Sequence, residues 1–406
     1  MTSRERIRAV LNRQIPDRVP NGLGGCETAG LHVLAYIKLQ NILGLPLYPP
    51  RVDTFMCNAV FEEDALQAIE SDILLLASPL MCKSDLRGSG IDAQWKKLTL
   101  WETKLRIPRA DEFRELNDGG VEWTTYANRV CPTGSFFFDE PIMPDYVYDE
   151  VLPNPDDYNP PHDISDTELR HFEDLAKQAY NETEYSICFG ETLTDLQYLP
   201  GGFVSGLILM NQERELIKEF VNKSVDAALA QLVLLEQAVG KYVDILSIAH
   251  DFSDNRGVIF GEPLWREIYK PCYKRLFGQW GKLTNMKSNL HCCGSVYGVL
   301  DDLVDSGVDI INPVQISAKN MLPKKLKEEY GNKIIFWGGA YDARCNSPDD
   351  DYEIVYKRVS ENIRVFGERG GYIMAGVHNL PPETPDVHLA AMLDAWRDNR
   401  YLYHEL

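Results

Sequence analysis

Residues 287–313, KSNLHCCGSVYGVLDDLVDSGVDIINP, contain the repeating unit on which the fold prediction depends. The short segments KSNLH (287–291) and DIINP (309–313) are predicted to be strands, and the segment 295–306 between them is typical of a helix. Two strands connected through a helix predict a parallel pair with a right-handed crossover.

The same alternation continues along the chain after residue 160. Further strands are predicted at 186–190, 244–250, 333–339 and 371–376. Helices are predicted at 165–180, 212–239, 263–280, 322–330 and 350–367. With SDILLL (71–76) added, the number of predicted parallel strands approaches eight, which favours a closed (β/α)8 TIM barrel over an open doubly wound sheet. No GxGxxG motif follows the first strand, which argues against a Rossmann domain.

The chain is longer than a bare barrel requires, because it has 406 residues and such a domain typically has ~250. Thr2 and Glu5 fit a capping box and predict an N-terminal helix, and a second helix is predicted at 28–43. The segments LTLWETKLRIP and GVEWTTYANRV alternate in polarity, which predicts β-hairpins within an insertion at about 80–160. We therefore expect a single α/β barrel domain, residues 1–406, with an N-terminal helical extension and a β-hairpin insertion. Length alone also allows two domains.

The composition restricts the class of protein. A formal net charge of −20 argues against nucleic acid or an anionic membrane surface as a partner. The sequence has no long apolar stretch of the kind that spans a membrane and no apolar core of a signal peptide near its start. The nine scattered cysteines do not resemble a disulfide framework, so we expect reduced thiols and a cytoplasmic protein.

Polar side chains follow the predicted strands at the ends where barrel enzymes place their active sites. Catalytic roles as acids or bases are predicted for Glu191, His250, Asp251 and Asp342. Contacts with the substrate are predicted for Glu27, Asp72, Asn312, Gln315 and Asn379. Three of these residues have a structural alternative, because Asp72 and Asp251 could be helix caps or members of ion pairs, and Glu191 could be a solvated loop charge.

A metal site is predicted around the turn after residue 290. His291 and Cys293 offer a nitrogen and a sulfur ligand on one tight turn, which suits zinc, and His378 follows a later strand at the same end of the barrel. Glu191, Asp251, a water or a substrate atom could complete a tetrahedron. In the alternative interpretation, the two cysteines are small buried apolar residues and His291 is a hydrogen-bonded histidine at a strand end.

Several segments carry a resemblance to a known superfamily. They are RERIRAVLNRQIPDRVP near the start, SDILLL at 71–76, LWREIYKPCYKRLF at 264–277, HCCGSVYGVLDDLVDSGVDIINPVQ at 291–315, IIFWGGAYD at 334–342 and GYIMAGVHNLPPETP at 371–385. In these motifs and their order the chain resembles the uroporphyrinogen decarboxylase superfamily, including its corrinoid-linked methyltransferase branch. The resemblance implies a (β/α)8 barrel.

The two branches imply different functions. The decarboxylase branch uses arginines of an Arg-Gln-Ala-Gly-Arg-Tyr segment to hold the carboxylates of a tetrapyrrole, whereas the comparable stretch here, NGLGGCETAG, has no arginine. In the methyltransferase branch, His-x-Cys and a distant Cys bind zinc. His291 and Cys293 match the first two ligands, and the segment Ala375-Gly376-Val377-His378 has no Cys. Either His378 replaces that Cys or the zinc site is altered or lost.

The resemblance to this branch leads to the function that we expect. The chain is expected to be a zinc-dependent methyltransferase that moves a methyl group between a small methylated substrate and a corrinoid protein, as a demethylase would. The corrinoid, as methylcobalamin, would come with the partner, since the chain has no DxHxxG motif. A homodimer is also implied by the resemblance. Decarboxylation of a carboxylated tetrapyrrole or aromatic compound is the alternative activity. The non-enzymatic alternative is a barrel that binds a ligand without converting it.

Overall fold

The structure is a computed structural model of the chain. It describes residues 1–76, 95–109, 111–125, 129–139, 152–160, 163–190, 193–194, 196 and 199–405.

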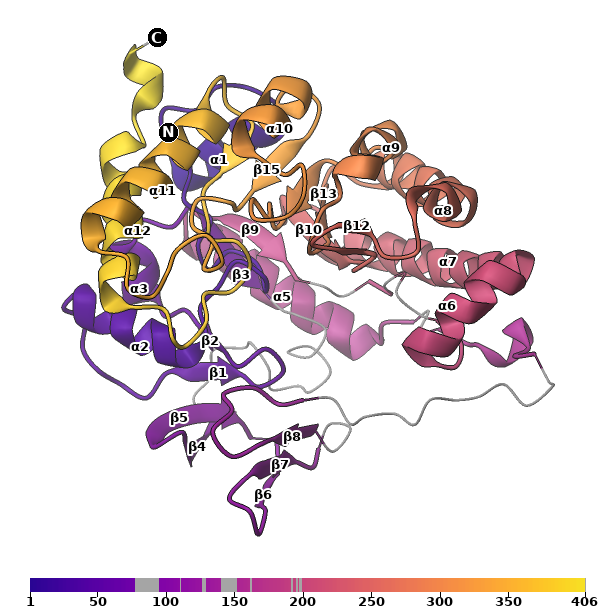
Figure 1. Ribbon diagram of the computed structural model, residues 1–406, viewed down its shortest axis with the longest axis horizontal. Coiled ribbons are helices and arrows are strands. Elements are labelled where there is room, and N and C mark those ends of the chain that lie inside the picture. The colour runs from indigo at the N-terminus through magenta and orange to yellow at the C-terminus, as the bar shows by residue number, and fades with distance from the viewer. Residues whose placement is uncertain are drawn as a thin grey trace.

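A curved parallel sheet forms the centre of the molecule (Figure 1). Its strands pair in the order β16-β15-β14-β13-β10-β9-β3, and every neighbouring pair is parallel. Their bounds are β3 (Ile73–Leu76), β9 (Ser186–Phe189), β10 (Ile245–Ala249), β13 (Lys287–His291), β14 (Ile310–Asn312), β15 (Ile335–Trp337) and β16 (Tyr372–Ile373). Because spatial order follows sequence order, the predicted barrel topology is confirmed.

The barrel is closed by residues 20–22, which were not predicted to form a strand. Met374 donates its N–H to the carbonyl of Pro20 and accepts from the N–H of Gly22, at 2.9 and 2.8 Å. On the other side, the N–H of Asp72 donates to the carbonyl of Asn21 at 2.8 Å. The segment therefore lies between β16 and the start of β3 and acts as the eighth strand. A Cβ on Gly22 would lie 2.5 Å from atoms of Ile373 and Trp337, so glycine is required there by the filled barrel interior.

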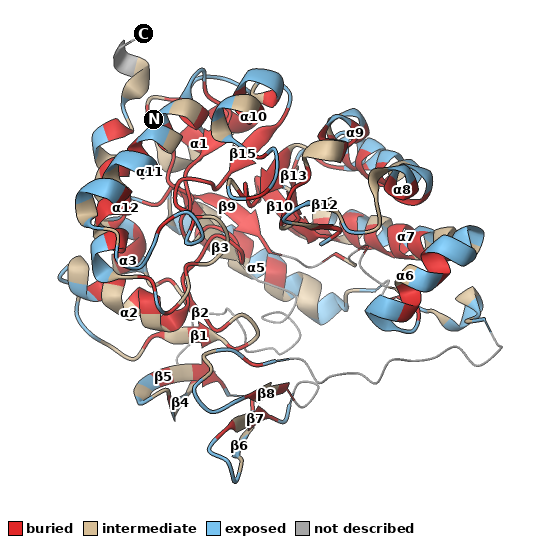
Figure 2. Cartoon of the chain, in the orientation of Figure 1, coloured by how far each residue is buried: buried red, intermediate tan, exposed pale blue. Residues whose placement is uncertain are grey.

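Helices surround the sheet and turn their buried faces toward it (Figure 2). The described helices are α1 (Ser3–Leu11), α2 (Val33–Ile42), α3 (Glu63–Ala68), α5 (Asp166–Glu182), α6 (Gly202–Gln212), α7 (Arg214–Val239), α8 (Glu262–Leu283), α9 (Leu300–Ser306), α10 (Pro323–Tyr330), α11 (Tyr352–Gly367) and α12 (Asp386–Asn399). The predicted capping box is present, because Thr2 accepts from the Glu5 N–H and Glu5 accepts from the Thr2 N–H. No helix among the described ranges has the length and apolarity that crossing a membrane requires.

Two apolar clusters fill the molecule. The smaller one occupies the barrel interior and contains strand residues such as Ile245, Ile310 and Ile335. Ile7 and Val10 of α1 belong to the same cluster, so this helix packs across the end of the barrel at which the strands begin. The larger cluster lies between the strands and the surrounding helices. The end of the barrel opposite to α1 is therefore the one available for a site.

The predicted β-hairpins are present, and they form two small sheets beside the barrel, of which the first is mixed because β1 and β5 pair in parallel and the second is antiparallel. One sheet has the order β2-β1-β5-β4 and the other β6-β7-β8. The bounds are β1 (Arg51–Asp53), β2 (Asn58–Val60), β4 (Trp95–Leu100), β5 (Thr103–Pro108), β6 (Phe113–Glu115), β7 (Val121–Trp123) and β8 (Arg129–Cys131). The first sheet includes residues 51–60, so it begins before the predicted insertion boundary at about residue 80.

Candidate metal centre

The structure brings His291, Cys293 and His378 together at the C-terminal end of the barrel. Their ligand atoms all lie within 4.8 Å of one another. His291 ends β13, Cys293 lies two residues later, and His378 follows β16. Since β14 and β15 separate these two strands in the sheet, only the curvature of the barrel places the three side chains at one point.

The distances within this cluster suit zinc. Bond lengths of about 2.3 Å to sulfur and about 2.0–2.1 Å to nitrogen in a tetrahedron place the two ligand atoms about 3.6 Å apart. The Cys293 Sγ and His291 Nε2 are 3.6 Å apart. The rings of His291 and His378 lie edge to face, with centroids 5.3 Å apart. The donor types suit zinc and the His291–Cys293 pair has the spacing of two zinc ligands, while the ligand atom of His378 lies within 4.8 Å of both.

Asn312 orients the His291 ring. Its Oδ1 accepts a hydrogen bond from the Thr28 hydroxyl at 2.6 Å and lies 3.4 Å from Nδ1 of His291. Its Nδ2 donates to the carbonyl of Trp337 at 3.3 Å, which keeps the oxygen turned toward the histidine. An acceptor at Nδ1 favours a proton there and leaves the lone pair on Nε2, the nitrogen that faces Cys293. Burial lowers the pKa of His291, which also favours the neutral ring.

His378 is held in a different way. Its backbone is in the left-handed region, with φ 58°, and its Nδ1 accepts from the N–H of Asn379 at 2.8 Å. Burial, and then the neighbouring His291, lower the pKa of His378 to about 3. Coordination through Nε2 would move the ring proton to Nδ1 and break the bond with Asn379. That bond contributes about 1 kcal/mol, which is small beside the ~10–16 kcal/mol of a structural zinc site.

Asp251 lies at the edge of the cluster. Its Oδ1 accepts from the N–H of Cys293 at 2.7 Å and is 3.8 Å from Nε2 of His291. The Asp251 side chain is 43% exposed, so it can reach a bound molecule as well as the cluster. A carboxylate in this position can be a further ligand or can exchange a proton with a substrate atom.

Gln315 and Asp342 connect the neighbouring loops. The Oε1 of Gln315 accepts from the N–H of Gly294 at 2.9 Å, directly after Cys293. The carboxylate of Asp342 accepts from the N–H groups of Ser317 and Arg344, at 3.1 and 2.8 Å. These contacts fix the loops that follow β13, β14 and β15 relative to one another.

His250 follows β10 but its ring packs against α8. Its Nδ1 is 2.8 Å from the Tyr273 hydroxyl, and its ring lies 4.7 Å from that of Tyr269. Burial lowers the pKa of His250 to about 3. The residue is therefore neutral at physiological pH, which does not suit the predicted role of a catalytic acid.

Asp72 lies at the other end of the barrel, because it precedes the first residue of β3 whereas His291 is the last residue of β13. Its side chain is fully buried and forms ion pairs with Arg6 and Arg18, at 2.6 and 3.1 Å. The N–H of Asn21 donates to the same carboxylate at 2.8 Å. The predicted contact with substrate therefore does not agree with its position, and the placement indicates a structural ion pair. Glu191 lies outside the described residues.

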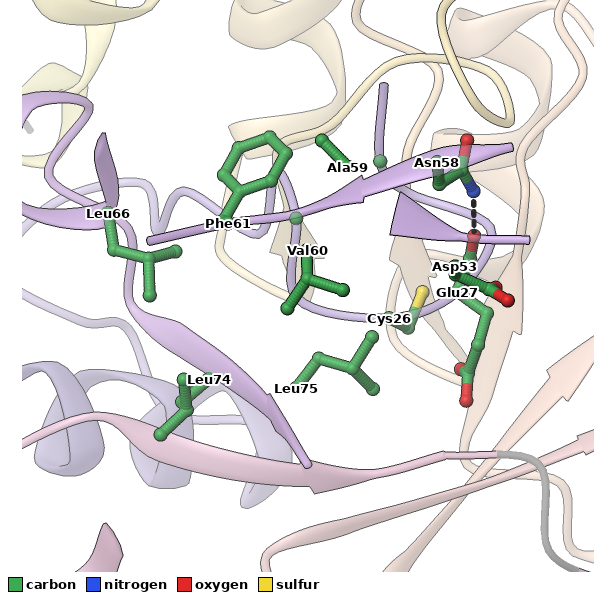
Figure 3. Close-up of a pocket in the computed structure, with 12 residues that line it drawn as sticks. Cys26, Glu27, Asp53, Asn58, Ala59, Val60, Phe61, Leu66, Leu74 and Leu75 are labelled. Carbon is green, nitrogen blue, oxygen red and sulfur yellow. Dashed lines mark hydrogen bonds between the residues drawn. The ribbon is translucent and has the colours of Figure 1, made fainter. Parts of the chain in front are cut away.

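The remaining predicted residues, Glu27 and Asn379, belong to the loop region beside the cluster. The N–H of Gly30 donates to Oδ1 of Asn379 at 2.7 Å. Glu27 lines a cavity together with Asp53 and Asn58, and Nδ2 of Asn58 donates to the Glu27 carbonyl at 3.0 Å (Figure 3). Asp53 and Asn58 were not predicted from the sequence, because they belong to the β1–β2 hairpin rather than to the end of a barrel strand.

Comparisons with known proteins agree with this architecture. The family model described as uroporphyrinogen decarboxylase (URO-D) matches residues 193–399, just over half of the chain. No curated protein matches the sequence. Among the solved structures that match is a methyltransferase from Methanosarcina mazei, with a TM-score of 0.54 and 13% sequence identity. The alignment covers 98% of this chain and 99% of that one, so the likeness extends over the whole fold.

Proposed function

Because the chain belongs to the uroporphyrinogen decarboxylase family, we propose that it is a zinc-dependent methyltransferase acting on a small methylated substrate. The observation that carries the proposal is the cluster of His291, Cys293 and His378, whose ligand atoms lie within 4.8 Å of one another. The name of the Methanosarcina mazei neighbour, a methyltransferase, supports the same class of reaction.

The chain's own residues have distinct roles in this proposal. His291, Cys293 and His378 would hold the ion, and Asn312 keeps the coordinating nitrogen of His291 unprotonated. With a single thiolate among these three ligands, zinc would supply a strong Lewis acid for a poor leaving group. Asp251, beside His291 and partly exposed, would hold or deliver a proton at the departing substrate atom. Glu191 is the second candidate for that acid, because it follows β9 in the sequence as Asp251 follows β10.

The methyl acceptor in this proposal is a corrinoid carried by a separate protein. The cluster lies at the C-terminal end of the barrel, away from the end that α1 covers, so we expect a partner to approach from that end. Methyl transfer is favoured over decarboxylation of a tetrapyrrole, because the segment 21–30 has no arginine to neutralise several carboxylates.

Metal analysis of the purified protein tests the proposal. We expect about one zinc per chain, and we expect Cys293→Ala to lose it while remaining folded. Cys345→Ala is the matched control, because Cys345 is an exposed free cysteine outside the cluster. Methyl transfer to a reduced corrinoid protein, followed by absorbance, should disappear together with the metal. Metal-free wild-type protein, or full zinc content in Cys293→Ala, would contradict the proposal.

A further inference from the structure

A cavity of about 50 Å³ is lined by the loop that follows residues 20–22, by the β1–β2 hairpin and by residues of α3 and β3. One water needs roughly 10–15 Å³ of such space, so the cavity can hold a small organic group. Its lining residues are Gly24, Cys26, Glu27, Gly30, Asp53, Asn58, Ala59, Val60, Phe61, Leu66, Leu74 and Leu75.

The loop 26–30 connects this cavity to the metal cluster. Cys26, Glu27 and Gly30 line the cavity. Thr28, from the same loop, donates to Asn312 Oδ1, which lies beside the His291 ring. Gly30 donates to Asn379, the residue after His378. A molecule in the cavity would therefore lie against the loop that contacts the residues around two of the proposed metal ligands.

The cavity has two chemically different ends. Figure 3 shows Leu66 and Leu74 at one end, and Glu27 and Asp53 at the other. Among the described residues that line it, two are carboxylates and none is basic. An apolar group is therefore favoured at one end, and an anionic group is disfavoured at the other.

Asn58 adds a second polar feature. It is 6% exposed, and its Oδ1 accepts no hydrogen bond within the described part of the chain. Its Nδ2 is already engaged with the Glu27 carbonyl. A buried oxygen acceptor without a donor costs about 1–3 kcal/mol, and a donor or a positively charged group bound nearby would recover part of it.

We propose that this cavity binds a cationic group of the substrate, with the positive charge beside Glu27 and Asp53 and an apolar part toward Leu66 and Leu74, and that the methyl group to be transferred is carried by a different atom of the same substrate. This proposal rests on the proposed methyl transfer, since it names the class of methylated substrate. The net charge of −20 also favours a cationic substrate, because an acidic protein attracts cations over a long range.

Calorimetric titration of the purified protein with three ligands of one shape tests the charge preference. Choline is the cation, 3,3-dimethylbutan-1-ol is its neutral isostere, and 3,3-dimethylbutanoate carries a negative charge. We expect choline to bind at least about tenfold more tightly than the neutral alcohol, and the anion to bind least tightly. Equal binding of choline and the alcohol, or no binding of any of the three, would overturn the proposal.

Variants locate the binding. Glu27→Gln should weaken choline binding about tenfold and leave the alcohol unchanged, and Asp53→Asn gives the same test if Glu27→Gln does not fold. Glu115→Gln is the control, because it removes one exposed charge from the insertion without touching the cavity. An unchanged affinity for choline in both Glu27→Gln and Asp53→Asn would contradict this location. Zinc content is measured in parallel: zinc without a preference for choline refutes only the cation site, and choline binding to metal-free protein refutes only the zinc-dependent function.

Discussion

Replacement of Asp72 by asparagine should strongly destabilise the fold. The carboxylate is fully buried and forms ion pairs with Arg6 and Arg18, whose side chains are 7% exposed. An asparagine side chain would keep the size of the aspartate but remove its charge. Arg6 would retain its ion pair with Asp17, whereas Arg18 would retain two backbone carbonyls at 3.4 Å and its contact with the Trp396 ring but no carboxylate at ion-pair distance. Removing one partner of a buried ion pair typically costs ~3–5 kcal/mol, so we expect a loss in that range from Asp72→Asn.

Urea unfolding, followed by circular dichroism, measures this loss. Asp17→Asn is the matched control, because Asp17 also pairs with Arg6 but is 31% exposed, and we expect it to cost at most about 1 kcal/mol. Zinc content should be unchanged in folded Asp72→Asn, since the residue lies at the opposite end of the barrel from the cluster. The reasoning is refuted if Asp72→Asn costs less than about 1 kcal/mol, or if it keeps full stability and loses ligand binding.

Three further substitutions test other parts of the structure. Gly22→Ala places a Cβ 2.5 Å from Ile373 and should cost ~1–3 kcal/mol in unfolding experiments; Gly278→Ala, where a Cβ meets no atom within 4 Å, should not destabilise. Asn312→Ala should weaken zinc binding ~10–100-fold in a chelator competition, and unchanged affinity would exclude its orienting role. Burial lowers the pKa of His32 to about 4, so the neutral ring is favoured in the folded state. The contribution of His32 to stability should therefore be constant above about pH 6.5 and fall by up to about 3 kcal/mol as the pH drops toward 4. The buried His250 and His378 add losses of their own in this range, so His32→Asn should make the pH profile of urea unfolding less steep by the contribution of His32 alone.

The barrel could be predicted from the sequence because most of its strands are apolar runs separated by helices. Seven strands were recognised in this way, and their parallel order is confirmed. The eighth could not be recognised, since residues 20–22 read Pro-Asn-Gly. The backbone hydrogen bonds of this segment come from Met374 and Asp72, far away in sequence, and Gly22, next to Trp337 and Ile373, leaves no room for a larger side chain.

The proximity of His291, Cys293 and His378 could also be predicted, because residues that follow parallel strands meet at one end of a barrel. The role of Asp72 was predicted differently. The sequence places Asp72 at the start of the strand predicted at 71–76, but it does not show that Arg6 and Arg18 lie beside that end of the strand. Asp53 and Asn58 were missed for a related reason, since a hairpin between two helices carries no periodic signal of a site.

The closure of the barrel by residues 20–22 has a consequence for synthesis of the chain. Pro20 leaves the ribosome about 350 residues before Met374, its hydrogen-bonding partner. At ~5–20 residues per second, this interval lasts tens of seconds. During that time the edge of residues 20–22 that pairs with Met374 has no partner, so we expect the barrel to close only after β16 has been synthesised.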